Sequence, residues 1–183
     1  NPGTYAVNLL VTTDLGCTSS LDKNIVIVDL PIAKFIANPT ACLGDNIHFT
    51  DLSISKDTDI ASWEWSSGDG NIMTLQNPSH EYKYAKTFDV TLAVKTLAAC
   101  ENDTTIRVNV HPLPIANFQA STLITSEIDA EIEFFNISEG ASEILWDFDN
   151  GVTSIVNNPI LEFSNIGNYD VLLTAISEFG CED

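Results

Sequence analysis

Basic residues are scarce in this chain of 183 residues. Seven Lys and Arg stand against 26 Asp and Glu, for a net charge of −19, and the segment 112–183 carries thirteen acids without any Lys or Arg. So acidic a surface repels phosphate backbones and anionic lipid headgroups. We therefore expect no nucleic-acid partner and no membrane-surface partner. The acidic surface is interpreted either as a solvated face or as a binder of hard cations.

The sequence also lacks three other features: long apolar runs, an initiating Met with a signal peptide, and clustered metal ligands. No run approaches the ~20 apolar residues of a membrane span, so membrane insertion is not expected. The sequence has no initiating Met and no signal peptide, and it begins inside a motif. We therefore expect a piece of a longer chain whose targeting signals lie elsewhere. There is no Cys-x-x-Cys, and the three His are dispersed and lack a nucleophile at motif spacing, which argues against a zinc site and against an enzyme.

A repeat dominates what is present. Its landmarks are an aromatic residue that opens an alternating run and a cysteine that follows the run: Tyr5, Phe88 and Tyr169; Cys17, Cys100 and Cys181. The two sets have identical spacings, which define a period of about 80 residues, and the segment 65–70 returns as 146–151 at the second of these spacings. The period predicts a closing hairpin of one repeat at 1–29, a complete repeat at 30–111, and a repeat lacking its last strand at 112–183.

Strand signals fill each repeat. Apolar residues alternate with polar or small ones after each landmark aromatic, which is typical of strands with one buried face: Phe88, Val90, Leu92 and Val94 in the complete repeat. Turn residues separate the runs, and no stretch carries a helical stripe. About 80 residues with roughly seven short strands predict an all-β, immunoglobulin-like sandwich. Short joints containing Pro31 and Pro114 are expected to act as semi-rigid spacers.

Three motifs of the complete repeat point to a known family. They are Trp-Ser-Ser-Gly-Asp-Gly at 65–70, Asn-Pro-Ser-His-Glu-Tyr at 77–82 and Thr-Phe-Asp-Val-Thr-Leu-Ala-Val at 87–94. With them the repeat resembles a polycystic-kidney-disease (PKD) domain. The third repeat departs further, with Trp-Asp-Phe-Asp-Asn-Gly at 146–151. The resemblance implies tandem PKD-like sandwiches, a fold that hosts many different functions.

A narrower resemblance rests on the Cys-Leu-Gly-Asp at 42–45 and the late Gly-Cys at 180–181. Such repeats are similar to those of giant surface adhesins of gliding bacteria that use the type 9 secretion system. This implies a non-catalytic structural and interaction segment of a long adhesin or filament on the bacterial cell surface. The partners implied are neighbouring repeats and cell-surface or secretion-system proteins, or extracellular polysaccharide or protein. The alternative is an accessory spacer or glycan-binding module of a secreted hydrolase.

The cysteines suggest one disulfide in the complete repeat. Cys42 follows its first strand and Cys100 lies in its last hairpin, so we expect a Cys42–Cys100 bond. In the chain-entropy model such a bond contributes roughly 4 kcal/mol. Cys17 is expected to pair upstream of Asn1, and Cys181 to remain a free thiol, because no cysteine occupies the corresponding place near 125–127. The bond would indicate an extracytoplasmic compartment.

Carboxylates give the only metal hypothesis. Asp69, between two glycines, together with Asp51 could ligate Ca²⁺, although the spacing is not diagnostic and the motif is more typical of a β-turn. No other cofactor is expected. The alternating segment 127–134 would line one face of a strand with acids, either as a weak Ca²⁺ platform or as a solvated stripe that blocks edge pairing.

Two residues are candidates for sugar chemistry. Trp63 lies two residues before Trp65 and would share its face on a regular strand, so one of the two is a candidate for an exposed ring that stacks on a glycan; the alternative is a core residue. Asn102-Asp103-Thr104 fits the N-glycosylation sequon. Thr104 also fits the O-glycosylation pattern of gliding bacteria.

Overall fold

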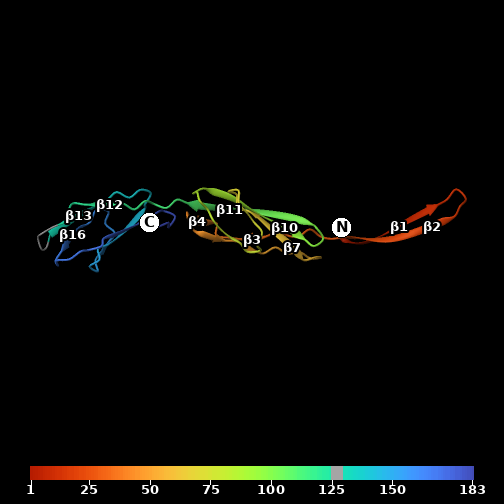
Figure 1. Cartoon of the computed structure of the whole chain (residues 1–183), viewed down its shortest axis with the longest axis horizontal. Coiled ribbons are helices and arrows are strands. Elements are labelled where there is room, and N and C mark those ends of the chain that lie inside the picture. Colours follow the sequence, from red (N-terminus) through yellow and green to blue (C-terminus); the bar gives the residue numbers. More distant parts are fainter. Residues whose placement is uncertain (125–129) are drawn as a thin grey trace. The chain divides into compact units, whose positions relative to one another are not determined.

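The computed structural model describes residues 1–124 and 130–183 (Figure 1). Within these residues every regular element is a strand and no helix occurs, so nothing in the described part resembles a membrane-spanning helix. The predicted all-β architecture is confirmed. The strands are β1 (Gly3–Thr12), β2 (Thr18–Ile27), β3 (Phe35–Ile36), β4 (Thr40–Cys42), β5 (Asn46–His48), β6 (Thr50–Asp51), β7 (Ile60–Ser66), β8 (Ile72–Met73), β9 (Ser79–Glu81), β10 (Thr87–Thr96), β11 (Glu101–His111), β12 (Phe118–Ala120), β13 (Ala130–Asn136), β14 (Glu143–Asp147), β15 (Thr153–Ser154), β16 (Ile160–Phe163) and β17 (Leu172–Ile176).

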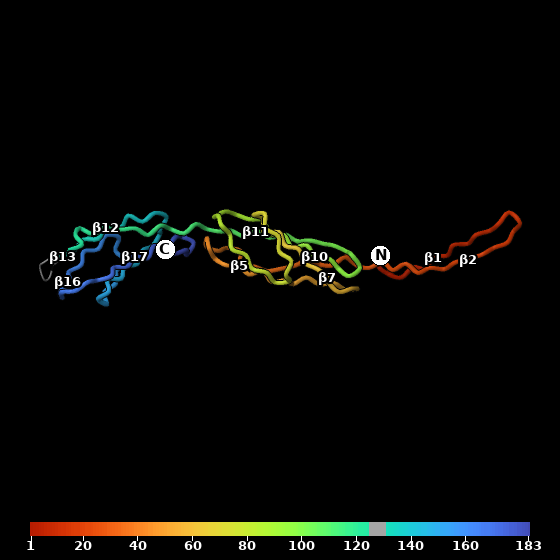
Figure 2. The backbone as a smooth tube through the Cα atoms, viewed as in Figure 1, coloured from red at the N-terminus to blue at the C-terminus, as the bar shows by residue number. Residues whose placement is uncertain are grey.

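Backbone contacts divide the chain into two compact units. The first comprises Asn1–Pro39, Asn46–His80 and Thr87–Val108; the second comprises Thr40–Asp45, Glu81–Lys86 and Asn109–Asp183. The border near 108 lies close to the predicted end of the complete repeat at 111. Two short segments of that repeat, 40–45 and 81–86, nevertheless belong to the second unit. The backbone course of both units is drawn in Figure 2.

The core of the first unit follows from the alternation of β10. Phe88, Val90, Leu92 and Val94 are all buried, and β10 is the middle strand of a five-stranded sheet ordered β4-β11-β10-β7-β8. The short pairs β3-β6 and β5-β9 form the other layer. Trp65 is fully buried, with its ring edge-on to Phe35 at 4.9 Å and tilted against Phe49 at 5.6 Å. These two layers make a sandwich, as predicted.

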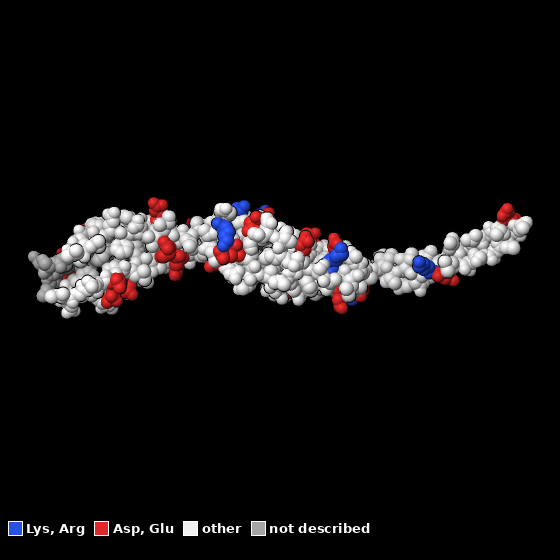
Figure 3. Space-filling model, in the orientation of Figure 1, with Lys and Arg blue, Asp and Glu red and all other residues white. Residues whose placement is uncertain are grey.

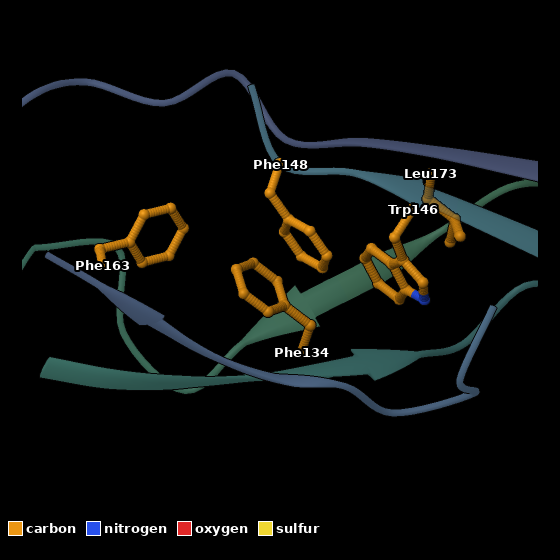
Figure 4. Close-up of a cluster of buried hydrophobic side chains, with 5 residues drawn as sticks. All are labelled: Phe134, Trp146, Phe148, Phe163 and Leu173. Atoms are coloured by element: carbon orange, nitrogen blue, oxygen red, sulfur yellow. The ribbon is translucent and has the colours of Figure 1, made fainter. Parts of the chain in front are cut away.

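The second unit has a core of the same kind (Figure 4). Five buried side chains form it, from β13, β14, β16, β17 and the turn after β14: Phe134, Trp146, Phe148, Phe163 and Leu173. Trp146 donates its indole N–H to the carbonyl of Val156 at 3.0 Å, just as Trp65 donates to the carbonyl of Leu75 at 2.9 Å. The two donors, and likewise the two acceptors, are separated by the second spacing of the sequence repeat.

The hairpin of β1 and β2 differs from the rest of the first unit. The strands pair in register from Gly3 with Ile27 to Thr12 with Thr18, and all their residues are exposed. Leu9, 59% exposed, corresponds to the fully buried Leu92 of β10. The apolar face of this hairpin therefore has no covering layer in the described residues. A two-stranded ribbon is marginally stable by itself.

Candidate functional site

The disulfide joins Cys42 to Cys181, whose Cα atoms are 5.5 Å apart and whose sequence separation is 139. Cys100 is a free, half-buried thiol and Cys17 a free, exposed one. The predicted Cys42–Cys100 bond is therefore wrong, and so is the prediction of a free Cys181. Both bonded cysteines belong to the second unit.

The strand order explains why Cys42 cannot reach Cys100. β4 pairs in parallel with the end of β11, where Cys42 lies opposite His111. Cys100 immediately precedes Glu101, the first of the eleven residues of β11. An extended strand of that length spans about 33 Å, whereas a disulfide needs Cα atoms roughly 4.4 to 6.8 Å apart. The two cysteines of the repeat thus lie at opposite ends of one strand.

Cys42 is held in a compact turn. Its N–H donates to Asp45 Oδ2 at 2.8 Å, and the N–H of Asp45 donates to the carbonyl of Cys42 at 3.0 Å. Gly44 supplies the positive φ of 92° that the turn requires. The N–H of Leu43 donates to the carbonyl of His111 at 2.8 Å, which fixes the turn beside the end of β11. We call residues 42–45 the early turn.

The other cysteines lie in a second kind of turn, which we call the late turn: residues 13–17, 96–100 and 177–181. In each, the first residue donates its N–H to the carbonyl of the cysteine at 2.8 or 2.9 Å. Its side-chain hydroxyl accepts the N–H of the same cysteine at 3.1 or 3.2 Å. The residue before the cysteine has a positive φ: 83° at Gly16, 63° at Ala99 and 77° at Gly180.

Ala99→Gly should stabilise the first unit. Left-handed φ costs an L-residue roughly 1–2 kcal/mol, and glycine gives back part of that through its larger unfolded-state entropy. We expect a net gain of about 0.5–1 kcal/mol in the free energy of unfolding, measured by urea titration. Ala98→Gly, a control in the same turn without a positive φ, should lower stability, and equal shifts for both variants would contradict the strain.

The carboxylate of Asp51 holds the side chain of Trp63 in place through a hydrogen bond. The indole N–H of Trp63 donates to Asp51 Oδ2 at 2.7 Å, and the amide of Gln76 donates to the same oxygen at 3.1 Å. The N–H of Ser53 donates to Oδ1 at 2.9 Å. Burial raises the pKa of Asp51, but the hydrogen bonds from Ser53, Gln76 and Trp63 outweigh it, so that the pKa lies below its ordinary value.

Asp69 is the centre of a second network. It accepts hydrogen bonds from the hydroxyl of Ser67, from the N–H and the side-chain amide of Asn71, and lies 2.7 Å from His80 Nε2. The side chains of Asp69 and His80 are 14% and 13% exposed. Burial raises the pKa of Asp69, but hydrogen bonds from Ser67, His80 and Asn71 lower it far more. This carboxylate therefore remains ionised and braces the 65–70 motif against the 77–82 motif.

Asp69→Asn should remove stability and flatten its pH dependence. Because the folded pKa of Asp69 is depressed, its contribution is present above the unfolded pKa of about 3.9 and is lost as the pH falls below it. We expect a loss of about 2 kcal/mol at pH 7. Between pH 5 and pH 2 the variant should lose less stability than the parent, measured by urea titration.

The control for that prediction is Asp89→Asn. Asp89 is 65% exposed and pairs with the 78% exposed Arg107, an ion pair of little energetic value. This variant should keep nearly all the stability at pH 7. A loss as large as that of Asp69→Asn would show that loss of any carboxylate charge, rather than loss of the Asp69 hydrogen bonds, sets the effect.

The structure shows the surroundings of the residues that were predicted to bind sugar or calcium. Trp63 is half-buried and its indole N–H is bonded to Asp51, while its contact with a glycan stays a prediction. Asp51 and Asp69 accept protein hydrogen bonds from different residues, and no group of three or more His, Cys, Asp or Glu suited to a metal occurs in the described residues. Calcium binding stays a prediction. Thr104 is half-buried within β11, and its glycosylation also stays a prediction.

The acidic stripe predicted at 127–134 falls partly outside the described residues, which resume at Ala130. Within β13, Glu131 is exposed, Glu133 half-buried and Phe134 buried. Figure 3 shows acidic side chains scattered over the face drawn rather than gathered into one patch. The surface thus offers no concentrated anionic site on that face.

The middle of the chain is similar to a known protein family. Residues 28–112 match the family model described as the PKD domain. Residues 28–112 are thus recognised as a PKD domain. Its predicted sequence motifs, at 65–70, 77–82 and 87–94, all lie within the matched stretch, and the two-layer architecture of the first unit agrees with an immunoglobulin-like sandwich.

Solved structures similar to the chain include PKD domains from two vibrios. The PKD1 domain of Vibrio anguillarum Epp is 26% identical, with a TM-score of 0.44, over 47% of this chain and 99% of that one. The PKD1 domain of the Vibrio cholerae metalloprotease PrtV is 24% identical, with a TM-score of 0.43, over 45% and 99%. A carbohydrate-binding module of the β-sandwich superfamily is 16% identical, with a TM-score of 0.46, over 82% and 86%.

Proposed function

We propose that this chain is a non-catalytic structural and interaction segment of a secreted cell-surface adhesin or filament, built of tandem PKD-like repeats. PKD domains are generally non-catalytic modules. The observation that carries the proposal is the Cys42–Cys181 bond, which ties the PKD stretch 28–112 to the segment that follows it. A bond that joins consecutive segments suits a chain that transmits tension along its length.

Recurring hydrogen bonds support the tandem arrangement. The N–H of Phe49 donates to the carbonyl of Pro78, and the N–H of Phe134 donates to the carbonyl of Pro159, both at 2.9 Å. Together with the indole hydrogen bonds of Trp65 and Trp146, these bonds show that two hydrogen bonds within residues 30–111 have counterparts within residues 112–183. The same disulfide supports an extracytoplasmic location, because such bonds persist in oxidising compartments.

The mechanical part of the proposal predicts a redox-dependent extension. When the chain is pulled from its two ends, the disulfide should carry the force past the segment between Cys42 and Cys181 and leave that segment unextended. Reduction should release roughly 480 Å of additional length, since an extended chain spans about 3.3–3.6 Å per residue. Single-molecule force spectroscopy with and without a reductant measures this. Equal extensions in both conditions would contradict it.

The cellular part is tested on the organism that produces the protein. Antibodies raised against this chain should label intact, unpermeabilised cells, and deletion of the corresponding coding segment should weaken attachment to surfaces. The competing assignment, an accessory module of a secreted hydrolase, predicts antigen in the culture fluid together with hydrolytic activity. That result would overturn the adhesin proposal.

A further inference from the structure

The late turns of residues 96–100 and 177–181 share one backbone conformation but differ in bonding. Cys181 is in a disulfide, whereas Cys100 is a thiol, although both turns are closed by the same pair of hydrogen bonds. Cys181 is 1% exposed and Cys100 is half-buried. The same type of turn therefore holds a disulfide-bonded cysteine at 177–181 and a free cysteine at 96–100.

Both late turns are fastened to the start of their own repeat. Asn102 donates its side-chain amide to the carbonyl of Pro31 at 2.8 Å. Asp183, which lies two residues after its cysteine as Asn102 does, accepts the N–H of Ala116 at 2.7 Å. Each late cysteine thus lies near the joint through which the chain enters its repeat.

The early turn lies at the opposite end of its repeat. Leu43 bonds to the carbonyl of His111, the last residue of β11, and the ring of His111 stacks on Phe179 of the late turn at 3.7 Å. The Cys42–Cys181 bond therefore runs from the end of one repeat to the beginning of the next. Such a head-to-tail contact uses two different surfaces and can be repeated along a series.

The first unit has a groove at the position that is equivalent to the site of the early turn in the second unit. Val28 precedes His111 by the spacing that separates Tyr5 from Phe88, so the two are equivalent positions of the repeat. Val28 lines a groove of about 460 Å³ with residues that include Ile27 and Lys56. In the second unit, the edge of β11 at residues 109–111 is occupied by β4. The corresponding edge at 26–28 borders this groove.

We propose that Cys100 forms a disulfide with the early-turn cysteine of another copy of this repeat, in the way that Cys181 bonds Cys42. The inference rests on the proposed tandem arrangement. Each copy is then tied to its neighbour by one bond, and Cys17, in the late turn of residues 13–17, is bonded in the same way. Formation of the bond removes two protons and two electrons from two thiols. A disulfide-bearing thiol oxidoreductase accepts them and becomes a dithiol.

The test is disulfide mapping of the parent protein, purified from its producing organism after alkylation and digested with trypsin without reductant. The sequence suits this design because its seven basic residues place each cysteine in a separate tryptic peptide. These peptides are one that ends at Lys23, 35–56, 96–107 and one that begins at Val108. We expect 35–56 to be linked to the peptide that begins at Val108, and 96–107 to be linked to a peptide with Cys-x-Gly-Asp from another copy. The mass of the unreduced protein tells whether that copy belongs to the same chain or to a second molecule.

Three results would overturn the proposal: Cys100 alkylated without reductant, Cys100 linked to 35–56, or Cys100 linked to a peptide without the early-turn motif. These outcomes are independent of where the protein is located, so they separate this inference from the adhesin assignment. A second measurement uses the recombinant chain with Cys181→Ala. Its Cys42 should stay alkylatable, and an intramolecular Cys42–Cys100 bond in that variant would contradict the head-to-tail rule.

Discussion

Replacing Cys42 and Cys181 together with Ala should lower the free energy of unfolding by about 4 to 5 kcal/mol. The bond closes a loop of 139 in sequence separation, and in the chain-entropy model a loop of that length contributes about 5 kcal/mol. If the PKD stretch stays folded while the following segment opens, the effective loop shortens to that segment and the contribution becomes about 4 kcal/mol. Alanine avoids burying a hydroxyl at position 181.

Hydrogen-exchange mass spectrometry shows which part of the chain loses stability in the double variant. The amides of Ala175 and Ser177, bonded to the carbonyls of Asp183 and Cys181, should exchange much faster in the double variant. Cys17→Ala, which removes an exposed free thiol, serves as the control and should leave exchange unchanged. A loss of less than about 1 kcal/mol would mean that the bond constrains the unfolded chain far less than its loop length predicts.

Gly68→Ala should be far more damaging than the same change at the other glycine of the 65–70 motif, with a loss of about 3 kcal/mol or more. A Cβ at this position would lie 2.6 Å from the carbonyl oxygen of Asp89 and 3.1 Å from its nitrogen. Asp89 lies on β10 between the buried Phe88 and Val90, so its backbone cannot retreat without disturbing the core. Overpacking of roughly 1–3 kcal/mol thus adds to the roughly 1–2 kcal/mol cost of the positive φ.

Gly70→Ala provides the matched control. Gly70 has a φ of 101°, but a Cβ there meets nothing within 4 Å, so only the conformational cost of roughly 1–2 kcal/mol applies. In the second unit Asp149 occupies the place of Gly68 with a φ of 58°, which shows that the turn itself tolerates a side chain. Urea titration should therefore rank Gly68→Ala well above Gly70→Ala, and equal losses would refute the clash.

Asp69 illustrates a limit of prediction from motifs. The glycines beside Asp69 suggested a turn or a calcium ligand, and the structure shows the carboxylate saturated by Ser67, Asn71 and His80. The signal was available, because Asp69 and His80 belong to the two adjacent PKD motifs. What the sequence lacks is the distance between the motifs, which depends on how the strands return across the sandwich.

The alternation of Phe88, Val90, Leu92 and Val94 determined the all-β class, the strand β10 and its buried face, because side chains of a strand alternate between core and solvent. The repeat period determined where equivalent turns lie. Only the tertiary structure decided which cysteines meet. Sequence proximity favoured Cys42 with Cys100, whereas β11 holds those two at opposite ends and brings Cys42 to Cys181. A disulfide depends on a distance of a few ångströms in space, and strand direction, which sequence spacing does not record, sets that distance.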